Sequence, residues 1–338
     1  FFNSIYKGKI EDHRLLKPFK IKQNILSTFL EIIFKTKDKK ILFFPSFKEC
    51  FTKFKKINPD IAIIRHYGRL NSYVTAVILK ILKTKIIFYE QAPNDFSHLK
   101  KKKIKLFFKI LELKLQNFFL SSFWMTPLKK NNSFLKNCFY LPFIVKVEKN
   151  YRSTKNFKIL IVGKFQRRKS IYLALKCLRE INTKFKIKAT IIGECTTIEH
   201  ELYLKKCQKF IKNNNLNSRV NIITNLNHKK IYYFYRTHHL FLLPSNNEPA
   251  SISLLEAIGQ SMPVICSDTC GTRFYVKKTF GKIFKSNNLK SLIDSVNFYL
   301  KNKKKYNDYS LSAYKFAKEN LTEKNYDKHL NKYIYEKK

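Results

Sequence analysis

The chain has 338 residues and a formal net charge of +45, from 68 lysines and arginines against 23 aspartates and glutamates. This length predicts two domains, and an apolar share of 44% is enough for ordinary hydrophobic cores. No stretch approaches the roughly 18 consecutive apolar residues of a membrane span, so the sequence predicts no membrane-spanning helix. The seven cysteines are odd in number, scattered and without zinc-type pairing, which indicates reduced thiols in a cytosolic protein.

Three explanations of the positive charge remain open. Lysine far exceeds arginine, and Asn, Ile, Phe and Tyr are also abundant, which is the pattern that A/T-rich codons produce. An anionic membrane surface is the second explanation. Nucleic acid is the third, but the lysines are dispersed along the whole chain and no recognisable nucleic-acid module is present. We therefore expect no nucleic-acid partner.

The N-terminal half is predicted to alternate strands with helices. The chain opens with Phe1-Phe2-Asn3-Ser4 rather than Met, which we interpret as the tail of an incomplete first strand. Arg65 and His66 lie where one predicted strand ends, and Glu90 and Gln91 lie where another ends. These polar side chains are therefore candidates for binding, although His66 also fits an ordinary loop residue. Apolar runs predict strands at 40–45, 60–65, 85–90, 124–127 and 138–142, and helical spacing predicts helices at 47–56 and 73–82.

A basic amphipathic helix is predicted over residues 98–118. Four lysines at 100–103 precede apolar residues that recur at helical spacing, namely Ile104, Phe107, Phe108, Leu111, Leu115 and Phe118. Cationic flanks beside aromatic residues are typical of a helix that lies on a membrane, where each nearby lysine contributes about 1 kcal/mol on anionic headgroups. The same pattern fits a helix whose apolar face covers the core of the N-terminal domain, and both explanations stay open.

A polar segment without periodicity, residues 147–156, is predicted to connect the two halves. It leads into Ile159-Leu160-Ile161-Val162-Gly163, a buried type of strand that ends in glycine. A basic turn with Lys164 and Lys169 follows, before a helix that begins at Ile171. Glycine permits close approach of the backbone at such a turn, and two ammonium groups there suit a phosphate.

The most informative segment runs from Pro244 to Ala257. Strands are predicted at 189–194, 219–224 and 240–243, and the last runs into a polar loop and then a short helix that ends at Gly259. Strands alternating with helices predict a parallel, doubly wound sheet, whose ligands bind beyond the carboxyl ends of the strands.

Two carboxylates flank the start of this short helix. Glu248 lies in the loop and Glu256 lies in the helix, and the free N–H groups and macrodipole at the helix start between them favour an anion. Such a site suits a ligand that is part phosphate and part polyol, for example a nucleotide sugar. Two plainer explanations stay open, because Ser253-x-x-Glu256 also fits a capping box and Glu248 also fits a solvated loop acid.

These segments resemble the donor-site motifs of retaining glycosyltransferases with the GT-B fold, the glycosyl transferases group 1 (family 4). Residues 248–256 are similar to the family's Glu-x7-Glu region, and residues 163–170 to its Gly-Arg-x-x-x-x-Lys-Gly pattern. Two departures stand out. Lys164 occupies the position of the family's Arg and cannot make a bidentate contact, and Ser170 replaces the last Gly, so the turn is expected to differ.

The resemblance implies roles for individual residues. Glu248 would contact the donor sugar and Glu256 the ribose, while Lys164 and Lys169 would stabilise the departing diphosphate. No Asp-x-Asp is present, so we expect neither a metal nor a cofactor beyond the nucleotide sugar itself. The remaining donor-binding residues would be Gly163, Ala250, Ser251, Ile252, Ser253, Leu255 and Gly271. The acceptor-binding residues would be Arg65, His66, Glu90 and Gln91, with His66 or Glu90 orienting the acceptor hydroxyl or receiving its proton.

The implied architecture is α/β: the GT-B fold of two Rossmann-like, doubly wound parallel-sheet domains facing a cleft. Residues 1–150 would bind the acceptor, residues 151–305 the nucleotide sugar, and residues 306–338 would return as helices to the N-terminal domain. The expected enzyme is a hexosyltransferase-type glycosyltransferase that retains anomeric configuration.

The expected acceptor is a glycan or a lipid-linked molecule, in bacterial surface polysaccharide synthesis. The enzyme would work in the cytoplasm or on the inner face of the cell membrane. A GT-B nucleotide-sugar epimerase would share the donor site, and a basic nucleic-acid-binding protein is the alternative from another class.

Overall fold

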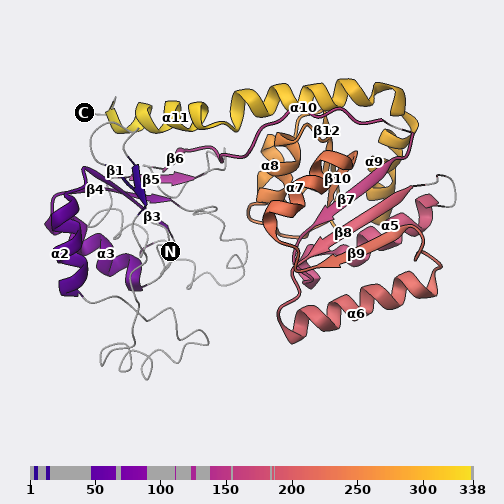
Figure 1. Ribbon diagram of the computed structural model, residues 1–338, viewed down its shortest axis with the longest axis horizontal. Coiled ribbons are helices and arrows are strands. Elements are labelled where there is room, and N and C mark those ends of the chain that lie inside the picture. The colour runs from indigo at the N-terminus through magenta and orange to yellow at the C-terminus, as the bar shows by residue number, and fades with distance from the viewer. Residues whose placement is uncertain are drawn as a thin grey trace. The chain divides into compact units, whose positions relative to one another are not determined.

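The computed structural model describes residues 4–6, 13–15, 47–65, 70–89, 111, 123–126, 138–153, 155–182, 185 and 187–335 of the chain. Contacts divide the chain into two compact units, one of Phe1–Leu141 with Asp327–Lys338 and the other of Pro142–Tyr326 (Figure 1). Each unit is built on one sheet, which confirms the α/β class. The predicted strand at 40–45, the predicted helix at 98–118 apart from Leu111, and the predicted site residues His66, Glu90 and Gln91 lie outside the described residues.

The sheet of the first unit has the order β2-β1-β3-β4-β5-β6. Strands β3 to β6 are parallel, whereas β1 pairs antiparallel with both β2 and β3. Antiparallel neighbours need no crossover helix, which suits the short β1 and β2. The elements are β1 (Ser4–Tyr6), β2 (His13–Leu15), α2 (Phe47–Ile57), β3 (Ile61–Arg65), α3 (Leu70–Ile81), β4 (Lys85–Tyr89), β5 (Phe123–Thr126) and β6 (Cys138–Tyr140).

The core of this unit is formed where α2 and α3 pack on the parallel strands. Phe54 of α2 and Leu79 of α3 are buried against Ile64 of β3 and Phe88 of β4. These positions follow the helical spacing and the apolar runs of the sequence. The strands predicted at 60–65, 85–90, 124–127 and 138–142 and both helices are confirmed to within a few residues.

The sheet of the second unit has the order β12-β11-β10-β7-β8-β9, and all neighbours are parallel. Successive strands run in one direction across the sheet from β7 to β9 and in the other from β10 to β12, so β7 and β10 meet at the topological switch point. Ligands of such sheets bind beyond the carboxyl ends of the strands at this point. The strands are β7 (Lys158–Val162), β8 (Lys188–Gly193), β9 (Val220–Thr224), β10 (Leu240–Leu243), β11 (Val264–Ser267) and β12 (Gly281–Phe284).

Helices cover both faces of this sheet, with α5 beside α6 and α9 on one face and α7 and α8 on the other (Figure 1). Coverage on both faces explains why β10 and β11 are short apolar runs with every residue buried. The helices are α5 (Ile171–Asn182), α6 (Ile198–Asn213), α7 (His228–Thr237), α8 (Ile252–Gly259), α9 (Leu289–Lys301), α10 (Tyr306–Asn320) and α11 (Glu323–Tyr335), with short 3-10 turns at η3 (Arg167–Lys169), η4 (Gly271–Tyr275) and η5 (Lys303–Lys305).

The segment that leads into β7 is fixed to the C-terminal ends of α7 and α8 by a buried guanidinium. Arg152 donates from Nη2 to the carbonyls of Tyr235 at 2.7 Å and Gln260 at 2.6 Å, and from Nη1 to that of Ser261 at 3.1 Å. Carbonyls at helix C-termini carry partial negative charge, so they stabilise the cation without a carboxylate. The guanidinium therefore holds the two helices together.

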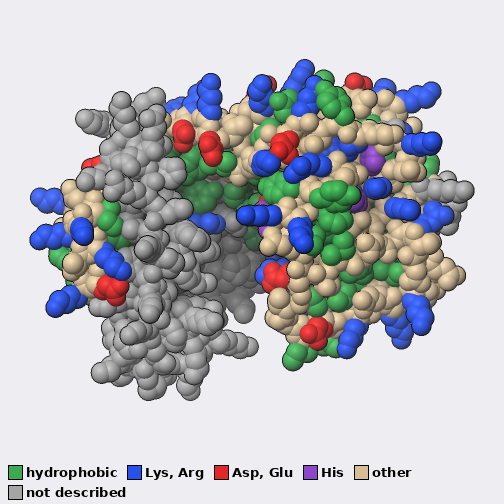
Figure 2. All heavy atoms as spheres, viewed as in Figure 1, with side chains coloured by type: hydrophobic (Ala, Val, Ile, Leu, Met, Phe, Trp, Pro, Cys, Tyr) green, Lys and Arg blue, Asp and Glu red, His purple; other side chains and the backbone are tan. Residues whose placement is uncertain are grey.

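Positive charge is spread over the face of the molecule that Figure 2 shows. Lysine and arginine side chains lie on many elements of the visible face and form no single concentrated patch (Figure 2). Among the helices that the structure describes, none is both long enough and apolar enough to cross a membrane.

Candidate functional site

The loops after β7 and β10 meet at the switch point of the second sheet. The backbone N–H of Asn246 donates to the carbonyl of Arg168 at 2.8 Å, and the Ser253 hydroxyl lies 3.5 Å from the carbonyl of Val162 at the end of β7. The two sequence motifs, 163–170 and 244–256, are thus brought together at one edge of the sheet.

Glu248 is a buried carboxylate that binds two cations. Only 5% of the residue is exposed, and its Oε2 accepts from Nη1 of Arg168 and from Nζ of Lys169, each at 2.5 Å. The Lys169 side chain is 13% exposed, whereas that of Arg168 is 41% exposed. The explanation of Glu248 as a solvated loop acid is therefore wrong. Sequence reasoning missed Arg168, whose only signal was its place in the basic turn.

The start of α8 lies directly after this cluster. Ser251 is the N-cap, and its hydroxyl accepts from the N–H of Leu254 at 3.3 Å. Ile252 and Ser253 are the first residues of the helix, so their N–H groups have no acceptor within the helix and favour an anion. The capping-box explanation of Ser253 and Glu256 is wrong, because Ser253 lies inside the helix and the Glu256 carboxylate turns toward α7.

Glu256 is bound by side chains of α7. Its Oε1 lies 2.7 Å from Nε2 of His228, and its Oε2 accepts from the Tyr235 hydroxyl at 3.0 Å. Burial, and then the charge of Glu256, raises the pKa of Tyr235 well above its usual value. Sequence reasoning gave His228 and Tyr235 no role. The one signal available was that α7 follows β9, whose carboxyl end lies at the same edge of the sheet.

Lys164 takes a different partner from Lys169. Its Nζ lies 3.0 Å from Oε2 of Glu194, in the loop after β8, and both side chains are about half exposed. The hydrogen bond from Lys164 is the main cause that lowers the pKa of Glu194. The two lysines expected to act on one diphosphate are therefore paired with two different carboxylates.

A pocket of about 450 Å³ opens beyond the carboxyl ends of β7, β8 and β9. Gly193 is required beside it, because a Cβ there would lie 2.4 Å from the Phe165 ring and 2.6 Å from the carbonyl of Gly163. Gly163 itself lies against the aliphatic stem of Lys169. The pocket is lined by Val162, Gly163, Lys164, Ile192, Gly193, Glu194, Thr196, Asn225, Leu226 and Ile231.

The turn between β7 and α5 keeps a glycine-like conformation despite its serine. Ser170 has φ 49° and ψ 33°, in the left-handed region that favours glycine. Its N–H donates to the carbonyl of Arg167 at 3.0 Å, and its own carbonyl accepts from Leu173 at 3.0 Å. Serine therefore adopts a strained backbone conformation at this position.

The other predicted donor residues divide between the loop and the core. Gly271 donates its N–H to the carbonyl of Glu248 at 2.7 Å, which joins the loop after β11 to the loop after β10. Ala250 is half-buried and Ile252 is exposed, whereas the Leu255 side chain is fully buried. Leu255 thus contributes packing of α8.

Arg65 is the one predicted acceptor residue that the structure describes. It ends β3 and is exposed, and its guanidinium lies 5.7 Å from the centre of the Tyr89 ring at the end of β4. Its position at the carboxyl end of a parallel strand suits a binding residue.

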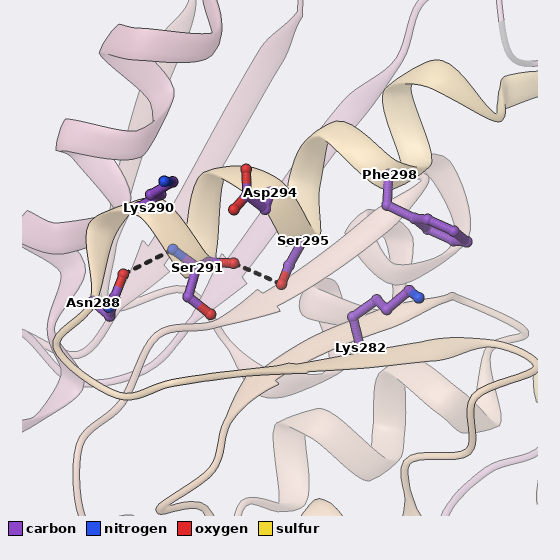
Figure 3. A pocket seen from close by; sticks show the side chains of 7 residues that line it. All are labelled: Lys282, Asn288, Lys290, Ser291, Asp294, Ser295 and Phe298. Atoms are coloured by element: carbon purple, nitrogen blue, oxygen red, sulfur yellow. Dashed lines mark hydrogen bonds between the residues drawn. The ribbon is translucent and has the colours of Figure 1, made fainter.

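A second hollow, of about 420 Å³, lies along α9 and β12 (Figure 3). Its polar groups are largely satisfied within the helix, because Ser291 donates its N–H to Asn288 at 2.8 Å and the Ser295 hydroxyl donates to the carbonyl of Ser291 at 2.8 Å. Lys282 lies 3.8 Å from the centre of the Phe298 ring, which it covers. The hollow contains none of the predicted site residues.

The structure is similar to several solved structures of other proteins. The structure resembles HepE from Anabaena in complex with UDP, with a TM-score of 0.70 at 12% identity over 86% of this chain and 82% of that one. It resembles sucrose-phosphate synthase from Thermosynechococcus elongatus, with a TM-score of 0.68 at 12% identity over 86% and 76%. It also resembles the lipopolysaccharide outer core galactosyltransferase WaaB, with a TM-score of 0.63 at 17% identity over 94% and 83%. The fold is the GT-B fold of glycosyltransferases.

The sequence profile named "Glycosyl transferases group 1" matches residues 145–316, more than half of the chain. The matched region contains the whole switch-point site. The chain belongs to the glycosyl transferases group 1 family, and the protein is a glycosyltransferase of the EC 2.4 class. A comparison with curated protein sequences finds no match.

Proposed function

We propose that the protein transfers a sugar, with retention of anomeric configuration, from a nucleotide-diphosphate sugar to a glycan or lipid-linked acceptor. The second unit binds the donor and the first binds the acceptor. The observation that carries this proposal is the buried Glu248 with Lys169 and Arg168 beside the start of α8, at the switch point of a parallel sheet. Cations and a helix start favour an anionic group, and the Glu248 carboxylate beside them can accept hydrogen bonds from hydroxyls of the same ligand.

The donor diphosphate is placed at the start of α8. Lys169 and Arg168 carry two positive charges against one negative charge on Glu248, so the cluster keeps a net positive charge for an arriving anion. The same charge stabilises the diphosphate as it departs. Lys164 adds a third cation once its Nζ leaves Glu194 and binds the ligand.

The nucleoside is placed in the pocket beyond β7, β8 and β9, with its ribose on Glu256. The pocket has an apolar side formed by Ile192, Leu226 and Ile231, which suits the face of a base. HepE has been solved with UDP and with UDP-glucose, which supports a nucleotide-sugar ligand for this chain and makes uridine donors the first to test.

The sugar is placed against Glu248 and the acceptor against the first unit. Arg65 and, outside the described residues, His66, Glu90 and Gln91 are proposed to bind the acceptor, with His66 orienting its hydroxyl or taking its proton. A role in bacterial surface polysaccharide synthesis accords with the printed name of WaaB, a lipopolysaccharide galactosyltransferase. The high positive charge fits a lipid-linked acceptor at an anionic membrane surface, with the protein on its inner face.

The reaction is proposed to need no divalent metal and no other cofactor. The sequence has no Asp-x-Asp, and Lys169 with Arg168 supplies the charge that a metal would bring to the diphosphate. We expect EDTA to leave the rate of sugar transfer unchanged. Loss of activity in EDTA that Mg²⁺ or Mn²⁺ restores would contradict this.

The test of the proposed function is a transfer assay with UDP-, GDP- and ADP-sugars and a mixture of glycan and lipid-linked acceptors, read by mass spectrometry of the product. A sugar added to an acceptor, with nucleotide diphosphate released in equal amount, supports the proposal, and NMR of the new linkage decides retention. An interconverted nucleotide sugar would instead identify an epimerase. Salt-sensitive binding to DNA or RNA with no affinity for any nucleotide sugar would identify a nucleic-acid-binding protein.

A further inference from the structure

Glu256 is held from two sides that differ in their freedom to move. The carboxylate is buried, with 6% of the residue exposed. One oxygen accepts from the Tyr235 hydroxyl at 3.0 Å and the other lies 2.7 Å from His228. A buried carboxylate needs such partners, because removing it from water without hydrogen bonds is costly.

Tyr235 is a fixed donor. Its side chain is fully buried, and the pKa of its phenol is raised well above the usual value by burial and then by the charge of Glu256. The phenol therefore stays protonated, and its hydroxyl donates a hydrogen bond to Oε2 of Glu256. Its ring packs against Phe241 of β10, with ring centres 6.0 Å apart.

The backbone around Tyr235 is also fixed. Arg152 donates from one nitrogen to the carbonyl of Tyr235 at 2.7 Å and to that of Gln260 at 2.6 Å. Tyr235 lies on α7 and Gln260 directly follows α8, so this guanidinium ties together the two helices that carry the phenol and the carboxylate. Tyr235 and Glu256 therefore cannot move apart unless buried hydrogen bonds break.

His228 is a displaceable partner. Its side chain is 65% exposed, and it is the first residue of α7, held by an edge contact with the Tyr232 ring at 5.7 Å. An exposed side chain at a helix start can rotate into solvent at little cost. The Oε1 atom of Glu256 is thus the oxygen that a ligand hydroxyl can take.

We propose that Tyr235 is a positioning residue for nucleotide recognition: it fixes Oε2 of Glu256 so that Oε1 receives a ribose hydroxyl, which replaces His228. This inference rests on the proposed function, in which Glu256 binds the ribose. It assigns the selectivity for ribose over deoxyribose to a residue on α7 that itself makes no contact with the nucleotide.

The test is a comparison of nucleotide binding by calorimetry in Tyr235→Phe and wild type. The probe is whichever of UDP, GDP or ADP wild type binds most tightly, together with its 2′-deoxy and 3′-deoxy forms. A hydrogen bond to a buried charged group is worth about tenfold or more in binding. We expect wild type to prefer the ribose form over at least one deoxy form by about tenfold, and Tyr235→Phe to reduce this preference to about twofold.

Tyr299→Phe is the matched control. Tyr299 is also buried, and its hydroxyl also donates one hydrogen bond, to the carbonyl of Phe280 at 3.0 Å, but it lies away from the switch point. A purely structural loss would weaken the ribose and deoxy forms equally, so Tyr299→Phe should keep the full preference. His228→Ala should change the preference by less than about threefold, because the ligand already displaces His228 from Glu256 in wild type.

The outcomes separate this inference from the function on which it rests. If wild type binds a nucleotide and prefers ribose, but Tyr235→Phe keeps that preference, the positioning role is wrong and the donor site stands. If wild type binds a nucleotide without preferring ribose, Glu256 does not read the sugar ring and the inference is wrong. If wild type binds none of the three nucleotides, the proposed function is wrong as well.

Discussion

One oxygen of Glu248 accepts hydrogen bonds from two cations, and the two differ in how much water surrounds them. The Lys169 side chain is 13% exposed and that of Arg168 is 41% exposed. Solvent screens the exposed member of such a cluster, so its charge contributes less. The buried ammonium is therefore expected to dominate the interaction with a departing diphosphate.

This difference gives a prediction for two neighbouring substitutions. Lys169→Gln should lower kcat/KM about 10²-fold or more, the size of effect seen when one preorganised donor to a developing charge is removed. Arg168→Gln should lower it about tenfold or less, because its charge is already screened. Steady-state transfer kinetics with both variants check this, and an equal loss in the two would contradict the assignment.

Backbone strain at Ser170 gives a second prediction. A non-glycine residue at φ 49° carries a steric cost that glycine avoids. Ser170→Gly should therefore raise the free energy of unfolding by about 0.5 to 1 kcal/mol in urea denaturation. Asn215 has φ 52° at a position away from the site, and asparagine tolerates this region, so Asn215→Gly should gain less. A loss of stability in Ser170→Gly would show that its side chain is needed.

At the scale of elements, α8 has the anion-binding start at one end and a close backbone contact at the other. A Cβ on Gly259 would lie 2.6 Å from the carbonyl of Lys146 and 2.8 Å from Cγ2 of Val145. The N–H of Glu148 also donates to the carbonyl of Gly259 at 2.8 Å. The segment before β7 therefore fixes where α8 ends, and so where its first turn lies.

Gly259→Ala should destabilise the protein despite the helix propensity of alanine. Overpacking against backbone costs about 1 to 3 kcal/mol, which exceeds the gain of up to about 1 kcal/mol from replacing glycine in a helix. Gly163→Ala is the control, because its Cβ would make only an ordinary contact, 3.4 Å from a flexible lysine stem. Thermal denaturation of both variants checks this, and an unchanged or higher Tm for Gly259→Ala would contradict the close contact.

The elements that the sequence predicts well are those with local patterns. The strands that end at Val162 and Leu243 are apolar runs followed by polar loops, and Gly259 marks the end of α8 in the sequence. The partners of Glu256 were not predictable, because His228 and Tyr235 lie on another helix and meet the carboxylate only through packing. The sequence also left the N-cap open, since Ser253-x-x-Glu256 imitates a capping box while Ser251 performs the capping.

At the scale of the whole molecule, stability in acid depends on buried histidines. His238 is buried between α7 and β8, where its Nδ1 lies 3.0 Å from the carbonyl of Phe234 and its Nε2 2.8 Å from the Thr190 hydroxyl. Burial lowers the pKa of His238 from 6.5 to about 4. Between pH 6.5 and about pH 4 the imidazole is therefore neutral in the folded protein and protonated in the unfolded chain.

Because the unfolded state binds the extra proton, the contribution of His238 to stability is complete above pH 6.5 and is lost as the pH falls toward 4. The loss by pH 4 amounts to about 3 kcal/mol. His238→Gln should therefore lose less stability than wild type between pH 7 and pH 4, in urea denaturation at both values. Charge repulsion in a chain of formal net charge +45 destabilises both proteins at low pH, so its effect cancels when the variant is compared with wild type. Equal losses in both proteins would contradict the buried neutral imidazole.

The central claim is that a nucleotide diphosphate binds at the start of α8, between the Glu248 cluster and Glu256. Its most direct test is calorimetric titration of wild type, Glu256→Ala and Lys169→Ala with UDP-, GDP- and ADP-sugars. We predict that wild type binds one of these donors and that each substitution weakens this binding about tenfold or more. Binding of no donor by wild type, or equal binding by all three proteins, would contradict the claim.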